Sequence, residues 1–407
     1  MAQSDNDRDV KVGLAGDAEQ ASGGVTRRSF MAKAGLAAGA IGLAGTIPTL
    51  AAGCGSSSSS SSSGSSGAST GEPTVIRFVF APDPVWNFMQ DTGIVAKWEE
   101  NYNFKIVNTT TWDETAWFIG GHADIASMGT YEVPLVAENA GKEFISFGVY
   151  NLMRDSIFVR SDSPYKTMED LKGQRISTAG TGASMLMYAA MFKKQYGVDL
   201  KLGGGDYKMS VQEFPAMPAA LSKGDVEASF GLIDFEIPYV KSGEHRWLYP
   251  DQPTGYEWYQ TYLDPSAVRH VACNLWVTTP AWLDANLKAA EGFNLMWQEG
   301  VNGWYADKKT IVQAYPDLFT TTNEAEVDWF LNYLNEDGGM HDQCVTNVFL
   351  DETWCQKEKD VFTLLKEQGF VKESTPDPLF KAITPPADAP PEALPPTSST
   401  PAASPSA

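Results

Sequence analysis

The segment of this sequence best suited to binding chemistry is a glycine-rich turn that leads into a long apolar helix. It reads Gly180-Thr181-Gly182-Ala183-Ser184. Glycines allow a ligand to approach the backbone, and the first N–H groups of a helix are unpaired and lie at the positive end of its dipole. A carboxylate, sulfonate or nitrate can bind there, with the Ser184 hydroxyl as a further donor. Alternatively, Ser184 does no more than cap its helix.

Other polar and aromatic side chains follow other predicted strands, where the edge of a sheet can border a ligand. Asp234 and Glu236, which follow the predicted strand 225–229, would suit an amine or hydroxyl of the ligand, although acidic side chains are more often solvated. Trp86 and Trp112 can stack on a planar ligand, although aromatic side chains after strands are more often part of the core. The full set of predicted ligand-binding residues is Asp83, Trp86, Trp112, Met128, Gly129, Thr130, Thr181, Gly182, Ala183, Ser184, Asp234 and Glu236.

The sequence gives little support to an enzyme. The part expected to fold, after the Gly/Ser tract, contains no G-x-S-x-G elbow, no H-E-x-x-H helix and no Walker A lysine. The four histidines stand far apart and lack the spacing of metal ligands; they are His122, His245, His270 and His341. We therefore predict no catalytic residue, no metal and no cofactor. There are two alternatives. One is an enzyme whose catalytic residues are brought together only by the fold, and the other is a sensor domain that acts on a separate partner.

Four cysteines occur, and they show no zinc-type spacing. Cys344 and Cys355 lie eleven residues apart and are a candidate disulfide in an oxidising compartment. Two unpaired thiols are the alternative, because spacing alone does not decide between them.

The balance of charge excludes one class of partner. The 407 residues include 30 Lys and Arg against 51 Asp and Glu, a formal charge of −21. Nucleic-acid binding rewards basic surfaces through counterion release, so no nucleic-acid partner is predicted. The length is sufficient for two domains that each bury a core.

The amino-terminal segment resembles an export and anchoring signal. Thr26–Lys33 resembles the twin-arginine signal, and the uncharged stretch Ala34–Ala52 follows it. A weak transmembrane anchor is the alternative for that stretch. Leu50–Cys54 resembles a lipobox, in which Cys54 would be acylated, although Ala51 stands where leucine is usual. The Gly/Ser tract that follows would be a flexible tether.

The elements that must position the candidate ligand-binding residues alternate between strand and helix. In the first half we expect strands over 74–80, 104–107 and 123–127 and helices over 85–101 and 111–118. In the second half we expect strands over 174–178 and 225–229 and helices over 185–196 and 214–223. This alternation with short connections predicts parallel sheets covered by helices on both faces.

Two stretches in different halves of the chain share one pattern. Gly121–Gly129 and Gly224–Gly231 each contain a helix end, an acidic residue, a strand of small residues and a closing glycine. Ligands of open α/β sheets bind beyond the carboxyl ends of strands, so two such ends facing each other would form a cleft. Coincidence between two ordinary helix–strand units is the alternative.

Four segments resemble signatures of periplasmic solute-binding proteins, in particular the group that serves nitrate, taurine and alkanesulfonate importers. They are Leu171–Ile176 leading into Gly180–Ser184, Gly120–Ala126, Ala219–Ala228 and Val277–Leu283. The chain departs from the group at Asp234–Pro238, where a Trp-Glu-Pro-like segment is frequent. The order of these segments along the chain carries more weight than any one of them.

This resemblance implies an α/β, two-lobed type II periplasmic-binding-protein fold, with two doubly wound sheets joined by two hinge crossovers. We expect the crossovers near 157–160 and 271–277. The expected organisation is a signal peptide over 1–53, a tether over 54–72, a first lobe over 73–158 and 272–383 with the C-terminal helices, a second lobe over 159–271, and a disordered Pro/Ala/Ser tail over 384–407.

The implied function is that of the extracytoplasmic substrate-binding component of an ABC importer. It would be a monomer, lipid-anchored to the outer face of the cytoplasmic membrane. Its partners would be a separately encoded permease and ATPase, and a small anionic or zwitterionic ligand of the sulfonate, taurine, nitrate or carboxylate class. The alternatives are a binding protein for an amine-containing or aromatic heterocyclic ligand of the thiamine-precursor type, or an exported enzyme on the same fold.

Overall fold

The computed structural model describes residues 71–129, 131–180, 183–267, 271–336 and 339–396. The predicted signal peptide, Cys54 and nearly all of the predicted tether lie outside these residues. No helix in the described ranges is both long and apolar enough to cross a bilayer.

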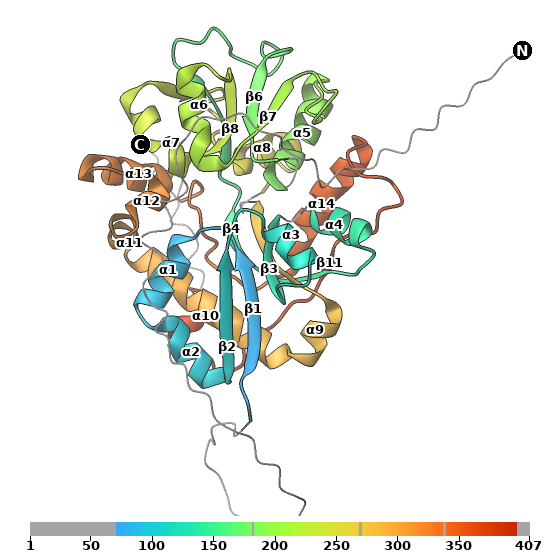
Figure 1. Ribbon diagram of the computed structural model, residues 1–407, viewed down its shortest axis with the longest axis vertical. Helices are drawn as coiled ribbons and strands as arrows, with labels where there is room; N and C mark the ends of the chain where they lie inside the picture. Colours follow the sequence, from blue (N-terminus) through green and yellow to red (C-terminus); the bar gives the residue numbers. More distant parts are fainter. Residues whose placement is uncertain (1–70, 130, 181–182, 268–270, 337–338, 397–407) are drawn as a thin grey trace, which may run out of the picture. The chain divides into compact units, whose positions relative to one another are not determined.

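The first sheet has six strands in the order β11-β4-β10-β3-β1-β2 (Figure 1). Their bounds are Thr74–Phe80 (β1), Phe104–Thr110 (β2), Ile125–Gly129 (β3), Ile145–Leu152 (β4), Ala272–Thr278 (β10) and Leu379–Phe380 (β11). β1 pairs in parallel with β2 and β3, and β10 runs antiparallel to β3 and β4. The carboxyl ends of β1 to β4 therefore share one edge of the sheet, and β10 begins at that edge.

The second sheet has five strands in the order β7-β6-β8-β5-β9. Their bounds are Asp155–Arg160 (β5), Arg175–Thr178 (β6), Lys208–Val211 (β7), Ala228–Leu232 (β8) and His245–Trp247 (β9). β6 pairs in parallel with β7 and β8, and β5 runs antiparallel to β8 and β9. The carboxyl ends of β6, β7 and β8 therefore share an edge, as in the first sheet.

Fourteen α-helices and two short 3-10 helices are described along the two sheets. Those that follow strands of the first sheet are α1 (Pro84–Asp91), α2 (Ile94–Tyr102), α3 (Glu114–Ile119) and α4 (Val133–Ala140). Those between strands of the second sheet and β10 are α5 (Ala183–Tyr196), η1 (Phe214–Ala216), α6 (Met217–Lys223), α7 (Ile233–Ser242) and α8 (Gly255–Tyr262). The remainder are α9 (Pro280–Ala285), α10 (Leu287–Ala306), α11 (Lys308–Ala314), α12 (Pro316–Phe319), α13 (Glu324–Asn335), α14 (Glu352–Glu367) and η3 (Pro391–Ala393).

The first strand and the helices after it show how local sequence sets these bounds. β1 ends before a proline pair, and the second proline begins α1, where its missing N–H costs nothing. We expected one helix over 85–101, but the structure has two. Gly93 separates α1 from α2 with a φ of +78°, a conformation that glycine adopts without strain.

The chain changes sheets twice, and the two connections lie side by side. Only Met153 and Arg154 separate β4 in the first sheet from β5 in the second. The Met153 N–H donates to the Val271 carbonyl at 2.9 Å, and β10 begins at the next residue. The outward crossover therefore precedes 157–160, where we expected it, because β5 already pairs with β8 from Asp155 onward.

An aromatic cluster fills the core under the first sheet. The Trp276 ring lies 4.2 Å from Tyr150, 4.6 Å from Trp297 and 5.4 Å from Phe78, measured between ring centroids. A Cβ at Gly148 would come within 2.5 Å of the Trp276 side chain. Only glycine therefore fits at that point of β4.

Two C-terminal segments differ from our expectation. We assigned the helices after β10 to the first lobe, but α14 packs on α5, and four apolar side chains of α14 belong to the core under the second sheet. We expected disorder from residue 384, but the amide of Asn302 donates to the carbonyls of Glu392 at 2.7 Å and Leu394 at 2.9 Å, and Ala393 is fully buried. Residues 384–396 thus pack on α10, because their backbone and an apolar side chain find partners there.

Candidate functional site

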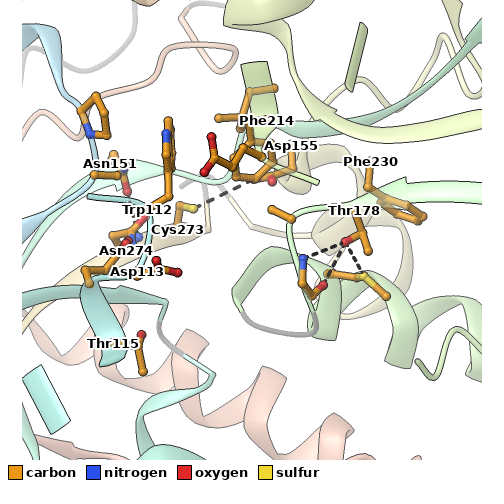
Figure 2. A pocket seen from close by; sticks show the side chains of 18 of the residues that line it. Trp112, Asp113, Thr115, Asn151, Asp155, Thr178, Phe214, Phe230, Cys273 and Asn274 are labelled. Atoms are coloured by element: carbon orange, nitrogen blue, oxygen red, sulfur yellow. Dashed lines mark hydrogen bonds between the residues drawn. The ribbon is translucent and has the colours of Figure 1, made fainter. Parts of the chain in front are cut away.

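A cavity of about 450 Å³ is lined by residues from both sheets (Figure 2). The first sheet and its connections supply Ala81, Pro82, Asp83, Trp112, Asp113, Glu114, Thr115, Glu132, Tyr150, Asn151, Cys273 and Asn274. The crossover and the second sheet supply Arg154, Asp155, Thr178, Ala179, Gly180, Met185, Val211, Gln212, Glu213, Phe214, Phe230 and Leu232. Most of these residues stand at carboxyl ends of strands, where open α/β sheets bind ligands, and the volume suits a small molecule.

Asp83, Glu114 and Glu132 are three carboxyl groups that line the cavity on the first-sheet side, one after each of β1, β2 and β3, and Asp113, next to Glu114, adds a fourth. Asp83 caps α1, and its Oδ1 accepts a hydrogen bond from the Trp86 N–H at 3.0 Å. Glu114 is the first residue of α3. Glu132 precedes α4, and its Oε1 accepts from the Gly129 N–H at 2.9 Å. A strand end and a helix start together fix the position of each carboxyl group.

Burial raises the pKa of all three carboxyl groups. The pKa of Glu114 is raised to about 8, and the negative charges of Glu132 and Asp113 add to the effect of burial. Burial raises the pKa of Glu132 to about 7, although the hydrogen bond from the Gly129 N–H acts to lower it. The pKa of Asp83 rises to about 6 for the same reason. Burial therefore outweighs the stabilisation that helix starts and amide donors give to these charges.

Glu114 is distinguished from its neighbours by an oxygen without a partner. Its Oε2 is shielded from solvent and accepts no hydrogen bond from the described residues. A shielded carboxyl oxygen left in this way costs free energy unless a proton or a ligand satisfies it. The cavity therefore contains an acceptor that is available to a ligand.

The crossover contributes one cation and one further acid. Arg154 donates through Nε to Oδ2 of Asp234 at 2.7 Å, and only 15% of the Arg154 side chain and 4% of the Asp234 side chain are exposed. Arg154 is the one basic residue among the described residues that line the cavity. Asp155 begins β5, and its Oδ2 lies 4.0 Å from Sγ of Cys273, whose pKa burial raises far above its usual range. The positive charge at the crossover is thus already paired.

An aromatic contact joins the two sides of the cavity. Trp112, which follows β2, lies 5.6 Å from Phe214 and 6.3 Å from Phe235, measured between ring centroids, and both partners follow strands of the second sheet. Figure 2 shows Trp112 and Phe214 on the cavity wall. Because these rings come from different sheets, a change in the separation of the sheets must alter this contact.

The predicted anion-binding turn is described only in part. Thr178 and Gly180 line the cavity, and the Thr178 hydroxyl donates to the Gly180 carbonyl at 2.9 Å (Figure 2). Thr181 and Gly182 lie outside the described residues, as do the side chains of Ala183 and Ser184. The start of α5 therefore borders the cavity, and its use as an anion site stays a prediction.

Among the other predicted residues, the structure brings Asp83 and Trp112 to the cavity but not Trp86 or Met128. Trp86 is 2% exposed and packs against Phe78 and Trp297 in the core, because its position on α1 points toward the first sheet. Met128 is fully buried in β3. Gly129 contributes its N–H to Glu132 rather than to the cavity wall, and Thr130 lies outside the described residues.

The two predicted carboxylates of α7 do not line the cavity. Asp234 binds Arg154, as described above. Glu236 is fully buried, and its Oε2 lies 2.6 Å from Nδ1 of His245. Both therefore hold neighbouring parts of the fold together, and Asp234 acts on the cavity only through Arg154.

The predicted disulfide is not present in the structure. Cys344 and Cys355 are both free thiols, and so is Cys273. Cys344 pairs with Asn151 through a β-bridge, whereas Cys355 lies on α14. The alternative of unpaired thiols describes this structure.

The sequence analysis missed most of the residues that give the cavity its charge. It did not single out Glu114, Glu132, Arg154 or Asp155, although an acidic residue within five positions of the end of each of β1, β2 and β3 was a usable signal. It also missed Tyr150, because β4 was not predicted as a strand. No group of three or more potential metal ligands is found among the described residues.

Comparison with known proteins gives a family match over part of the chain and a fold. A family model described as "ABC transporter, phosphonate, periplasmic substrate-binding protein" matches residues 103–245. No curated protein matches the chain. The solved structure of the periplasmic aliphatic sulphonate binding protein SsuA from Escherichia coli has a TM-score of 0.55 and 15% identity, covering 74% of this chain and 95% of that one.

Two further solved structures agree with this comparison. The alkanesulfonate-binding protein SsuA from Xanthomonas axonopodis pv. citri, bound to MOPS, has a TM-score of 0.56 and 15% identity, covering 75% of this chain and 96% of that one. The nitrate-binding protein NrtA from Synechocystis PCC 6803 has a TM-score of 0.53 and 14% identity, covering 75% and 84%. At these identities the structures share a fold and do not transfer a ligand.

This chain has the fold of the periplasmic binding proteins. The predicted fold class is confirmed, and so is the recognised similarity to the nitrate, taurine and alkanesulfonate group. Fold and family match support a substrate-binding component of an ABC transporter, a class that works outside the cytoplasm with a small-molecule ligand and a membrane permease. The named relatives are binding proteins, which indirectly favours binding over catalysis.

Proposed function

We propose that this periplasmic-binding-protein chain captures a small solute in the cavity described above and delivers it to the permease of an ABC importer. One observation carries the proposal: a single cavity of about 450 Å³ is lined by the carboxyl ends of strands from both sheets. This arrangement lets each lobe hold one side of a ligand. Its volume lies within the range typical of small-molecule sites.

The connections between the sheets support a mechanism of closure. The two crossovers run side by side and are joined by the hydrogen bond from Met153 to Val271. A few residues at such a position can absorb the dihedral changes of a hinge. The distance between the Trp112 and Phe214 rings would then change as the lobes move. A bound solute would stabilise the closed arrangement.

The class of ligand has two candidates from the sequence. An anion would use the start of α5, and the named relatives bind aliphatic sulphonates, alkanesulfonates and nitrate. An amine-containing ligand would use the carboxyl groups that follow β1, β2 and β3. The balance of charge in the described lining favours the second candidate, since six acidic residues line the cavity beside a single arginine, whose Nε is bound to Asp234.

Export and anchoring belong to the same proposal. The segments that resemble a twin-arginine signal and a lipobox precede a Gly/Ser tract, and acylation at Cys54 would tether the binding lobes near a permease. Mass spectrometry of the chain recovered from membranes tests this: a diacylglyceryl group on Cys54 is expected, and an unmodified Cys54 would contradict it.

A thermal-shift screen of small anions, amines and zwitterions tests solute capture. A ligand at 100 times its Kd stabilises the folded chain by about 2.7 kcal/mol, which gives a measurable rise in Tm. Ala179→Trp places a large side chain at an exposed position of the cavity wall and should abolish the rise. Ala285→Trp makes the same change at an exposed position of α9 outside the cavity and should leave it unchanged. Equal binding by both variants would place the ligand elsewhere.

A further inference from the structure

We infer that the ligand carries a positively charged nitrogen, a protonated amine or a quaternary ammonium, held by the carboxyl groups of Glu114, Glu132 and Asp83. This inference rests on solute capture in the cavity and specifies the chemical class of the solute. It departs from the sulfonate and nitrate named for the related structures. The three carboxyl groups are called the acidic wall below.

The charge around the cavity supports a cation. The acidic residues of the described lining are Asp83, Asp113, Glu114, Glu132, Asp155 and Glu213. The one basic residue there, Arg154, is bound to Asp234. Where these carboxyl groups are ionised, a free inorganic anion would be repelled by the acidic wall, whereas a cation would be attracted to it.

Two acidic residues at the opposite edge of the same sheet are paired with basic residues, unlike those of the acidic wall. Asp124, just before β3, binds Arg77 with 2.5 Å between oxygen and nitrogen. Glu99 binds Lys105 at the start of β2, also at 2.5 Å. No lysine or arginine among the described residues forms a salt bridge with Glu114, Glu132 or Asp83. The missing partner of this wall is a positive charge that another molecule can supply.

Helix capping does not account fully for these carboxyl groups. Asp83 accepts hydrogen bonds from backbone N–H groups of α1, and Glu132 accepts from the Gly129 N–H and the Thr115 hydroxyl, while a carboxylate can accept about four donors in all. Glu114 has a shielded Oε2 without a partner in the described part of the chain. An ammonium group among these oxygens would supply the missing donors or, if fully methylated, the missing charge.

Aromatic rings stand beside the acidic wall and fit the same ligand class. Trp112 and Tyr150 line the first-sheet side, and Phe214 and Phe230 line the other. The faces of aromatic rings attract cations, and organic ammonium groups offer methylene or methyl surface to them. A site that combines carboxylates with ring faces thus favours an organic cation over a hydrated metal ion, in keeping with the lack of a metal cluster among the described residues.

Cation binding should be linked to proton release. The other titratable and charged groups around the acidic wall are Asp113, Tyr150, Arg154, Asp155, Glu213, Asp234 and Cys273. The pKa values of Glu114 and Glu132 are raised to about 8 and about 7. Near neutral pH a cation must displace protons from them, so affinity should rise at least about tenfold between pH 6 and pH 8.

The test compares cations with neutral molecules of the same shape. Titration calorimetry on the full chain would use choline, putrescine, benzylamine and N-methylpyridinium at pH 6 and pH 8. Neutral counterparts would be 3,3-dimethylbutan-1-ol for choline and benzyl alcohol for benzylamine. Nitrate, methanesulfonate and methylphosphonate would represent anions, and taurine zwitterions. At least one cation should bind, more tightly at pH 8, and its neutral counterpart should bind at least about thirtyfold more weakly.

Two variants complete the test. Glu114→Gln keeps the shape of the side chain and should weaken binding of the cation at least about thirtyfold, with a smaller dependence on pH. Glu373→Gln makes the same chemical change at an exposed position outside the cavity and should have no effect. Unchanged cation affinity in Glu114→Gln would overturn the inference.

The remaining outcomes separate this inference from solute capture itself. If an anion binds, no cation does, and Ala179→Trp abolishes anion binding, the ligand class is wrong and solute capture stands. If no member of either panel binds, both the ligand class and capture of such solutes fail.

Discussion

The two walls of the cavity differ in the chemistry that they offer to a ligand. The first-sheet wall presents three carboxyl groups after consecutive strands, together with Trp112 and Tyr150. The second-sheet side has fewer carboxyl groups, Glu213 and, at the crossover, Asp155, beside apolar and backbone groups around Thr178 and Gly180 and the rings of Phe214 and Phe230. The first wall concentrates the carboxyl groups, and the apolar groups of the second can exclude water when the lobes close.

This difference assigns an order to recognition. Charged groups act over a longer range than apolar contacts, so a cationic solute should reach the acidic wall first. Closure of the second wall would then remove water and strengthen the electrostatic attraction already formed. The Arg154–Asp234 pair at the crossover links the two steps, because Arg154 lines the cavity while Asp234 stands at the start of α7.

The largest effect is expected from breaking this link. Asp234→Ala leaves Arg154 without its carboxylate in a site where little of either side chain is exposed. Loss of one partner of a buried pair should lower the free energy of unfolding by about 3 kcal/mol, measured by urea denaturation. Lys105→Ala breaks an exposed pair with Glu99 and should cost less than about 1 kcal/mol. Equal costs would show that the crossover pair is not a structural link.

The comparison of the walls is tested directly by neutralising one of them. The double variant Glu114→Gln with Glu132→Gln should weaken cation binding by about a hundredfold, measured by calorimetry at pH 8. The loss should differ from the sum of the single losses, because the two groups repel each other. Gln212→Ala removes a polar group of the second wall and should weaken binding by less than about threefold. A larger loss of affinity in Gln212→Ala than in the double variant would assign charge recognition to the second wall.

The aromatic contact between the walls gives a smaller effect. Trp112→Ala removes the ring that meets Phe214 and should weaken ligand binding by about tenfold, mainly through faster release. Trp117→Ala is the matched control, since Trp117 lies on α3 five residues after Trp112, is 41% exposed and does not line the cavity. Stopped-flow tryptophan fluorescence separates the rate constants. Similar rate constants of ligand release in the two variants would show that Trp112 does not take part in closure.

The smallest effect concerns the stability of the empty chain. The pKa of Glu114 in the folded chain is about 8, above its ordinary value, so its contribution to stability is present below pH 4.5 and is lost as the pH rises through 8. Glu114→Gln should therefore raise the free energy of unfolding at pH 9 and change it much less at pH 5. Glu373→Gln should change neither value. A variant less stable than the parent at pH 9 would show that Glu114 is already neutralised by a partner.

Much of the fold followed from the sequence because its signals are local. β1 lies at the predicted residues 74–80, where branched and aromatic residues end at prolines. β8 begins three residues later than predicted, at Ala228, because Asp225 and Val226 belong to the turn before the strand. The packing of α14 on α5 and of residues 384–396 on α10 depends on contacts between distant segments, which periodicity does not reveal.

The site was less accessible to prediction than the fold. Asp83 and Trp112 were predicted from their positions after strands, and the structure brings both to the cavity. Glu114 and Glu132 stand at equivalent positions, but a carboxyl group at a helix start is ordinary in a sequence. Only burial makes these groups unusual, and burial depends on how the two sheets meet. The prediction that Trp86 binds the ligand was wrong, because α1 directs the Trp86 ring into the core.

The central claim is that the acidic wall holds a positive charge, and a crystal structure of the chain with the tightest-binding molecule of the calorimetric panel tests it most directly. The account predicts an amine nitrogen about 3 Å from carboxylate oxygens of Glu114 or Glu132, or methylated nitrogen against the same oxygens and the Trp112 ring. An anionic group bound at the start of α5, with the oxygens of Glu114 and Glu132 facing only water, would contradict it.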